Sequence, residues 1–488
     1  MKKIYLVGLL TLLGFVVSSC NKWLDLQPQD GITKSEFWKT KEDVRAALMG
    51  IYSSLNAGPV ETRIFLWGEL RADMVDVSSY ATEDYRLVRN YNILSMNDIS
   101  NWAALYSVIN NCNLLIDFAP DAKTSDPTFT DAEYNSYVGE ALTIRSLLYF
   151  YLIRTFKEIP LKLNGSYRDT DVQTIGQVSA IVVLDQLEQD LKKAQNLVPD
   201  YQVAAMNNFS VNPDNTGRIV KPAVHMLLAE LYMWKEQYAA AEVELDKVLS
   251  SNRYQLVGRM TSTSFDVSNS ETIFEISHKE SRANPLTPLV STGRIPYIAL
   301  TEIIDTEFFP PNLQVDMDKF DSRGEGVLYR SNGTVLKYGE ETPSFYNFPI
   351  FRISDAMLLK AEAAAEQDRG AEALQILYKL RESRGAIEAS NRVVDEDNLD
   401  DVIQFIFQER AREFCFEGKR WFDVLRLAKK DNYTNISVII DVISKIVDSS
   451  VQQSALNKGR DVNSHYLPIH EEELFRDNKL VQNPFYLK

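Results

Sequence analysis

The chain has 488 residues, a net charge of −16, 45% hydrophobic side chains and 25% charged side chains. This length exceeds that of a usual single-core domain, so we expect two domains or an array of repeats around an ample apolar core. Because the acidic charge is spread along the chain, we expect repulsion from nucleic acid and from anionic lipid headgroups.

The first twenty residues have the features of an export signal. Two lysines precede an apolar run over residues 4–17, which is shorter than the roughly 20 residues that span a bilayer. Small residues then lead directly to Cys20, in an arrangement similar to the lipobox of bacterial lipoproteins. We therefore expect a signal peptide over residues 1–19, an acylated Cys20 and a tether over residues 20–40. Ordinary secretory cleavage is the alternative.

Amphipathic helices dominate the rest of the chain, and several come in pairs. Thr40 and Asp43 form a box-like N-cap before a helix that is expected to run to about Leu55. Another helix is expected over residues 102–118. Further helices form pairs that resemble tetratricopeptide repeats, and each pair must stack on a neighbour to bury its apolar face. The expected pairs are 144–152 with 184–194, 224–232 with 238–249, 354–367 with 371–383, and 402–414 with 418–428.

Two long segments lack this periodicity. The second half of residues 61–101 is irregular, and residues 250–350 are rich in proline, apart from an alternating strand near 271–278. Irregular stretches of this length are usually functional. We expect a mostly α fold in which helix pairs form a superhelical scaffold for a loop-rich ligand-binding face with little β structure. Its expected parts, packed as one domain, are 41–249, 250–350 and 351–488.

Acidic and basic residues alternate in a block near the C-terminus. Paired carboxyl groups there could act as the acid and base of a glycoside hydrolase. Arginine beside a carboxyl group lowers its pKa, however, whereas a general acid needs a raised pKa. We therefore expect a structural ion-pair network and no catalytic residue. Its expected members are Glu409, Arg410, Arg412, Glu413, Glu417, Arg420, Asp423 and Arg426.

Motifs for metals and cofactors are not evident in the sequence. The four histidines lack the spacing of metal ligands, and neither a P-loop nor a dinucleotide fingerprint occurs. Asp316, Asp318 and Asp321 resemble a calcium loop only loosely. We expect no cofactor and no metal, and we expect Cys112 and Cys415 to be buried free thiols.

Several blocks of residues occur along the chain in an order typical of one family. They are Cys20-Asn21-Lys22-Trp23-Leu24-Asp25 with Pro28, Glu140-Ala141-Leu142 with Arg145 and Ile159-Pro160-Leu161, Gly217-Arg218 with Lys221, Arg352 with Asp355, the block 409–426, Leu467-Pro468-Ile469, and Gln482-Asn483-Pro484. These blocks resemble the SusD/RagB family of surface glycan-binding lipoproteins. The resemblance implies helix pairs that support a loop-built face. It also implies a TonB-dependent, SusC-like transporter as partner, over which the lipoprotein acts as a lid.

A sugar-binding surface needs flat apolar rings beside amide, carboxylate or guanidinium groups. Tyrosines between residues 80 and 91 lie where no helical period requires them, with arginines between them. Asp73 lies at a position that the resembled family often uses beside its ligand. The alternative is that the tyrosines pack the insertion onto the helices. The predicted glycan-binding residues are Asp73, Tyr80, Tyr85, Arg86, Tyr91 and Tyr297.

The sequence and the resemblance together predict a lipoprotein of the outer membrane that faces outward, binds an oligo- or polysaccharide and delivers it to a TonB-dependent transporter. We expect no enzymatic activity. One alternative is a glycoside hydrolase, which would need two unpaired carboxyl groups in a cleft. The other is a tetratricopeptide-like scaffold that binds proteins and no glycan, which would lack aromatic-rich insertions.

Overall fold

The computed structural model describes residues 37–168, 174–201, 216–261, 263–266, 269–279, 282–310, 321–340, 344–386 and 393–487. Cys20, Asp316 and Asp318 lie outside these residues. The described chain is mostly helical with short strands, as the hydrophobic periodicity predicts.

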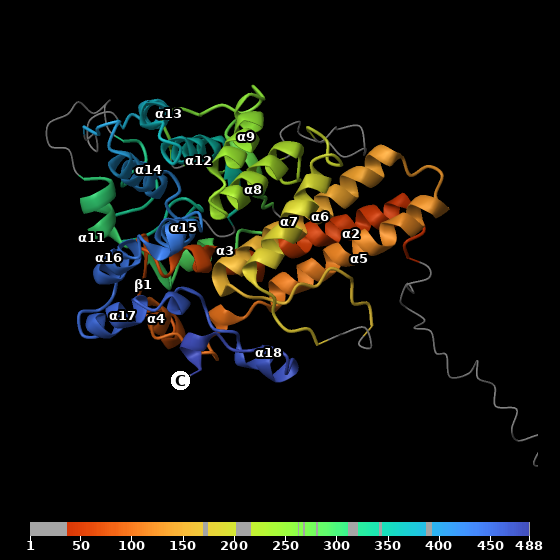
Figure 1. The fold of residues 1–488 in the computed structure, drawn as a ribbon, viewed down its shortest axis with the longest axis horizontal. Helices are drawn as coiled ribbons and strands as arrows, with labels where there is room; N and C mark the ends of the chain where they lie inside the picture. The colour runs from red at the N-terminus through yellow and green to blue at the C-terminus, as the bar shows by residue number, and fades with distance from the viewer. Residues whose placement is uncertain are drawn as a thin grey trace, which may run out of the picture.

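A bundle of long helices occupies the right of Figure 1, with α6 packed against α2, α5 and α7. Thr40 begins α2 with the expected capping box: its hydroxyl accepts from the Asp43 N–H, and the Asp43 carboxylate accepts from the Thr40 N–H. Because neighbours surround α6, it is buried around its whole circumference over its second half. The helices of the bundle are α2 (Lys41–Leu55), α5 (Ala103–Ser125), α6 (Asp131–Phe156) and α7 (Ala180–Ala194).

The other helix pairs continue from α7 in chain order. Helix α8 (Lys221–Trp234) packs on α7, and α12 (Ile353–Ala365) packs on α9 (Tyr238–Leu249). Both α12 and α13 (Gly370–Ser383) contact α14 (Leu399–Glu413). Each helix lies within a few residues of its expected bounds, so the apolar spacing located these elements well. In the last helix the backbone leaves the helical conformation at Lys430, close to the predicted end at residue 428. The pairs are α8 (Lys221–Trp234) with α9 (Tyr238–Leu249), α12 (Ile353–Ala365) with α13 (Gly370–Ser383), and α14 (Leu399–Glu413) with α15 (Arg420–Tyr433).

Two short antiparallel ladders connect strands of the segment 250–350 to the strand that follows α3 (Pro59–Glu69) and to the strand that precedes α12. β1 (Val75–Val77) pairs with β3 (Tyr297–Ala299), and β2 (Thr272–Ile276) pairs with β4 (Phe348–Arg352). Residues of β2 and β4 are buried throughout, and β2 is the strand that the alternating pattern predicts. The same segment contains α10 (Thr287–Val290), α11 (Thr301–Ile303) and the π-helical turn η5 (Ile304–Phe308).

Short helices complete the fold, and one of them corrects a prediction. The sequence predicts that the second half of residues 61–101 is irregular, but Glu83–Arg89 form a helix of 7 residues, α4. Two turns are too short to establish a period of 3.6, which explains the difference. The other short elements are α3 (Pro59–Glu69), η2 (Asp98–Ser100), α16 (Ser437–Ile446), α17 (Gln452–Gly459), η7 (Val462–His465), α18 (Glu471–Arg476) and η8 (Pro484–Tyr486).

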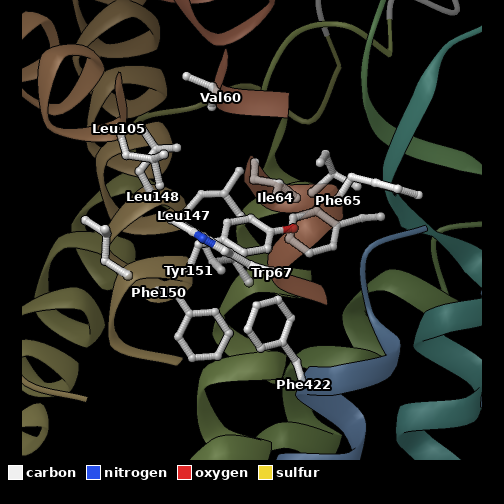
Figure 2. Close-up of a cluster of buried hydrophobic side chains, with 14 of the residues drawn as sticks. Val60, Ile64, Phe65, Trp67, Leu105, Leu147, Leu148, Phe150, Tyr151 and Phe422 are labelled. Atoms are coloured by element: carbon white, nitrogen blue, oxygen red, sulfur yellow. The ribbon is translucent and has the colours of Figure 1, made fainter. Parts of the chain in front are cut away.

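Large side chains from distant parts of the sequence meet in the core. Figure 2 shows Trp67 of α3 beside Phe150 and Tyr151 of α6, with Phe422 of α15 nearby. The Trp67 ring lies edge-on to Phe156 with ring centroids 5.4 Å apart, and its indole N–H donates to a backbone carbonyl at 2.7 Å. Helix α3 therefore joins the bundle to α15.

The structure also bears on membrane spanning and on the state of two cysteines. Within the described ranges, none of the helices combines the length and the apolar character needed to cross a bilayer. Cys112 and Cys415, both in the described part of the chain, are buried free thiols, as predicted.

Candidate ligand-binding site

The β1–β3 ladder places the segment after Asp73 against Tyr297. In this ladder Val77 lies opposite Tyr297, and the Ser78 N–H donates to the Pro296 carbonyl at 2.9 Å. The Tyr85 ring on α4 then lies edge-on to the Tyr297 ring, with centroids 5.4 Å apart. The structure thus brings together predicted residues from two distant parts of the chain.

Tyr80 is the most exposed of the predicted glycan-binding residues, with 58% of its surface accessible. The guanidinium carbon of Arg294 lies 5.9 Å from the centroid of its ring. The exposed Asp98 pairs with Arg63 at 2.5 Å and accepts a long hydrogen bond from the Tyr85 hydroxyl at 3.4 Å. We call Tyr80, Tyr85, Asp98 and Arg294 the tyrosine face. It offers aromatic rings beside charged groups, as sugar binding requires.

Arg86 supports the turn that carries Tyr80. Its Nη2 donates to the carbonyls of Ser78 and Ala81, at 3.0 and 3.4 Å. The Tyr80 N–H donates to the Ser78 hydroxyl at 3.0 Å, and that hydroxyl donates to the Ile295 carbonyl. Because these bonds hold the turn against the segment before β3, Tyr80 projects from a fixed backbone.

The other predicted residues are buried: Asp73, Tyr91 and Tyr297 have exposed fractions of 1%, 4% and 3%. Asp73 accepts from Arg420 Nε at 2.7 Å and Nη2 at 2.9 Å. Burial alone would raise the pKa of Asp73, but the Arg420 guanidinium lowers it below its usual value. Tyr91 donates its hydroxyl to a backbone carbonyl at 2.9 Å. Because Asp73 and Tyr91 are buried in this conformation, neither is part of the tyrosine face, and the buried Tyr297 ring packs against Tyr85.

The charged block of residues 409–426 lies in the core. Glu413 is fully buried and pairs with Arg323 and Arg352 at 2.9 Å and with Arg384 at 2.7 Å. Burial would raise the pKa of Glu413, but these guanidinium groups hold it well below its ordinary value. The other pairs are Glu417 with Lys337 and Arg352, Arg410 with Asp355 and Asp423, Arg420 with Asp73, and Arg426 with Glu362 and Asp423.

Glu409 illustrates what this block can do chemically. It pairs with Arg323 and Arg381 at 2.6 Å and with Arg412 at 2.8 Å. Although burial opposes the effect, these arginines lower the pKa of Glu409 to about 2. A carboxyl group with this pKa is ionised at neutral pH and cannot donate a proton to a leaving group. The arrangement favours an ion-pair network over a pair of catalytic carboxyl groups.

The partners of this block were missed by sequence reasoning. Arg323, Arg352, Arg384 and Glu271 come from four separate segments, and all are buried. The one local signal is that Arg384 follows Arg381 by three residues, which places both on one side of a helix end. Asp98 and Arg294 of the tyrosine face were also missed. A single charged residue in an irregular segment belongs to no sequence pattern that would mark it.

Helix α3 carries buried carboxyl groups of a different kind. Burial raises the pKa of Glu61, and it raises that of Glu69 to about 8. Glu61 pairs with His278 at 3.0 Å, and Glu69 accepts from the Gly418 N–H at 2.7 Å. Both glutamates have an exposed fraction of 0%, so neither offers an acid that a sugar could reach. Among the residues that the structure describes, no group of three or more His, Cys, Asp or Glu is placed to hold a metal ion.

Two family models match the chain. One describes the SusD family and matches residues 317–486. The other describes starch-binding proteins associating with the outer membrane and matches residues 22–211. The two matches do not overlap, and together they cover most of the chain.

Curated and solved proteins are similar to the chain over most of its length. The chain is 27% identical to SusD-like protein P38 of Formosa agariphila over 473 residues, which cover 85% of this chain and 89% of that protein. A SusD superfamily protein of Bacteroides vulgatus has a TM-score of 0.73 at 21% identity, covering 92% of this chain and 100% of that one. NanU of B. fragilis has a TM-score of 0.68 at 21% identity, covering 95% and 100%. At these identities the likeness to the solved structures establishes the fold.

Proposed function

The chain belongs to the SusD/RagB family, and from this premise we propose that it is a lipid-anchored protein of the outer membrane that binds glycan at the cell surface. Its cargo is an oligo- or polysaccharide, which it passes to a SusC-like, TonB-dependent transporter. Lipid on Cys20 provides the anchor.

The tyrosine face is the observation that carries this proposal. Tyr80 exposes 58% of its surface on a turn held by Arg86, and the Arg294 guanidinium lies 5.9 Å from its ring centroid. Tyr85 is held in place by the Tyr297 ring beneath it. A pyranose can stack its CH groups on such rings while its hydroxyl groups bond to Asp98 and Arg294.

Weak binding fits the proposed hand-over. An aromatic pair contributes roughly 0.5–1.5 kcal/mol beyond burial, and a sugar CH face contributes no more than that. We therefore expect dissociation constants from about micromolar to millimolar, or roughly −8 to −4 kcal/mol. A ligand held this weakly leaves quickly, which suits a protein that must release it to a partner.

The alternatives are less consistent with the geometry. A glycoside hydrolase needs an accessible carboxylic acid, but Glu409 and Glu413 are buried among arginines that lower their pKa. A protein-binding scaffold of helix pairs would lack aromatic-rich insertions, whereas here Tyr80 is exposed on a turn that hydrogen bonds of Ser78 and Arg86 hold.

A glycan array with the purified mature protein tests the proposal and identifies the sugar. We expect selective binding to one class of oligosaccharide, which a Tyr80→Ala, Tyr85→Ala variant loses. Hydrolysis of a bound glycan would support the enzyme alternative instead. Absence of binding to every glycan, with intact fold, would contradict the proposal.

A further inference from the structure

A cavity lies where the end of α6 meets the C-terminal segment, and none of its lining residues belongs to the tyrosine face. It has a volume of about 370 Å³, within the usual range of roughly 300–1,000 Å³ for small-ligand pockets. The C-terminal segment with α18 lies at the bottom of Figure 1. The lining residues used below are Lys157, Glu158, Gln177, Asn463, Lys479 and Gln482.

The wall of this cavity is assembled from segments that clamp one another. Gln177 exchanges hydrogen bonds with the backbone of Val481: its Nε2 donates at 2.6 Å, and its Oε1 accepts at 3.0 Å. Lys479 Nζ donates to the Thr174 carbonyl at 2.7 Å. A side chain at Gly176 would lie only 2.9 Å from the Lys479 carbonyl oxygen, so the two backbones touch here. The cavity is therefore a built feature of the fold and not a gap between loose loops.

Lys157 enters this cavity from an unusual backbone conformation. It has φ 69° and ψ −56°, and the Glu158 N–H donates to the Phe156 carbonyl at 2.8 Å. Together these features define a classic γ-turn, which is rare and strained for a residue with a side chain. Such strain persists only where the surrounding structure enforces it, and it concentrates at binding sites. Here it turns the Lys157 side chain away from the axis of α6 and into the cavity wall, where its ammonium lies 3.3 Å from Asn463 Oδ1.

The residues that line the cavity include more cationic than anionic side chains, although the protein as a whole is acidic. Lys157 and Lys479 line the cavity against the single lining carboxylate of Glu158. Behind the wall, the buried Arg71 donates to the His465 carbonyl at 2.7 Å, and no carboxylate of the described residues pairs with it. Burial, and then the charges of Arg71 and Lys157, lower the pKa of His465 to about 4. His465 is thus neutral at physiological pH and adds no charge beside the cavity.

The nearby acidic and amide groups complete the chemistry. Asp461 and Asp477 are occupied by hydrogen bonds from the backbone N–H groups of Asn463 and Ile175. Gln177 and Asn463 each use part of their capacity on the protein, so each keeps an amide hydrogen and a lone pair for a ligand. Amides that both donate and accept suit the hydroxyl groups of a sugar.

We propose that this cavity is a second binding site, which takes a carboxylate-bearing, polyhydroxylated ligand of monosaccharide size, with Lys157 and Lys479 on the carboxylate and Gln177 and Asn463 on the hydroxyl groups. The site does not depend on the tyrosine face. Nor does it depend on the proposed delivery of glycan to a transporter.

Calorimetry of the mature protein with glucuronate as probe and glucose as neutral control tests the site. We expect glucuronate to bind with a millimolar or tighter dissociation constant that weakens as salt is added, and glucose to bind at least tenfold more weakly. A Lys157→Gln variant should bind glucuronate at least tenfold more weakly. The matched control Lys193→Gln, which removes an exposed charge on α7, should bind within twofold of wild type.

Two further variants separate the possible outcomes. A Tyr80→Ala, Tyr85→Ala variant should bind glucuronate normally, because the two sites are separate. If Lys157→Gln does not fold, Lys479→Gln should show the same direction of loss, since Lys479 is exposed and contributes the other ammonium. Absence of glucuronate binding to wild type would overturn the proposal. So would equal affinity in a folded lysine variant, or loss of binding only in the tyrosine variant.

Discussion

The Glu413 carboxylate neutralises guanidinium groups that have no access to water. Arg323, Arg352 and Arg384 all contact it, and each is nearly or completely buried. A Glu413→Ala variant removes the one carboxylate that these three buried guanidinium groups share, although Arg323 keeps Glu409 and Arg352 keeps Glu417. The loss of charge compensation should lower the free energy of unfolding by roughly 3–5 kcal/mol. Chemical denaturation measures the loss. Glu382→Ala, at an exposed position of α13, should change stability by less than about 0.5 kcal/mol. A Glu413→Ala protein with wild-type stability and lost ligand binding would instead place Glu413 in a site.

Glu69 should make stability fall as the pH rises. Burial raises the pKa of Glu69 from 4.5 to about 8, so between these pH values the unfolded chain holds fewer protons at this residue than the folded one. The contribution of Glu69 is fully present below pH 4.5 and is lost as the pH rises through 8. A Glu69→Gln variant removes this term, and its stability relative to wild type should rise by roughly 2–5 kcal/mol between pH 4.5 and 8. If the free energy of unfolding differs between the two proteins by the same amount at pH 4.5 and at pH 8, this assignment is wrong.

At the residue scale, the sequence was a better guide to which side chains form ion pairs than to which side chains are exposed to solvent. Alternating Glu and Arg at 409–426 was enough to expect ion pairing, since arginine beside a carboxyl group has few other roles. Tyr80 and Tyr91 looked alike in sequence, yet Tyr80 projects into solvent, whereas Tyr91 is buried with its hydroxyl donating to the Arg71 carbonyl. That difference depends on the β1–β3 pairing, which no local pattern encodes.

Helix α3 and the turn before α15 approach each other without intervening side chains. A Cβ atom at Gly68 would lie 1.8 Å from the Gly418 carbonyl oxygen, and Gly418 itself has φ 70°. Gly68→Ala should therefore destabilise the protein by about 3 kcal/mol or more, because backbone must move. Gly50→Ala on α2 meets nothing within 4 Å and should raise stability by about 0.5–1 kcal/mol. Thermal unfolding of both variants measures the contrast, and similar melting temperatures would show that the contact is not as close as the structure has it.

At the element scale, length decided what could be predicted. Long helices such as α12 repeat their apolar period over several turns, so their bounds followed from spacing alone. The short helix α4 and the three-residue strands β1 and β3 offer too few repeats. Because the tyrosine face rests on these short elements, its architecture could not be predicted even though Tyr80, Tyr85 and Arg86 could be nominated.

At the scale of the whole molecule, the proposed lipid anchor would hold the proposed ligand sites at the membrane. Cys20 follows a short apolar run at the N-terminus, which predicts lipidation. Replacement of Cys20 by Ala should release the protein from the membrane fraction into the soluble fraction, because no other acylated residue is expected. Cell fractionation with immunoblotting measures this, with an unchanged lipoprotein as the fractionation marker. A variant that stays with the membrane would contradict anchoring through Cys20. Protease treatment of intact cells then tests whether the chain faces outward.

A rigid helical scaffold presents the small aromatic surface of the tyrosine face. The helix pairs and the ion-pair network supply that rigidity, and the insertion supplies the ladder that positions α4. Because the scaffold and the tyrosine face are built from different parts of the chain, substitutions in the tyrosine face should change glycan affinity without changing the free energy of unfolding.

Calorimetry of the Tyr80→Ala, Tyr85→Ala variant, with the glycan that the array identifies, tests the central claim most directly. Tyr378→Ala removes a partly exposed tyrosine from α13 and serves as the matched control. We predict that the double variant melts within a few degrees of wild type and binds the glycan at least tenfold more weakly, while the control binds normally. Undiminished affinity in a double variant that melts like wild type would contradict the account and move the binding site away from the tyrosine face.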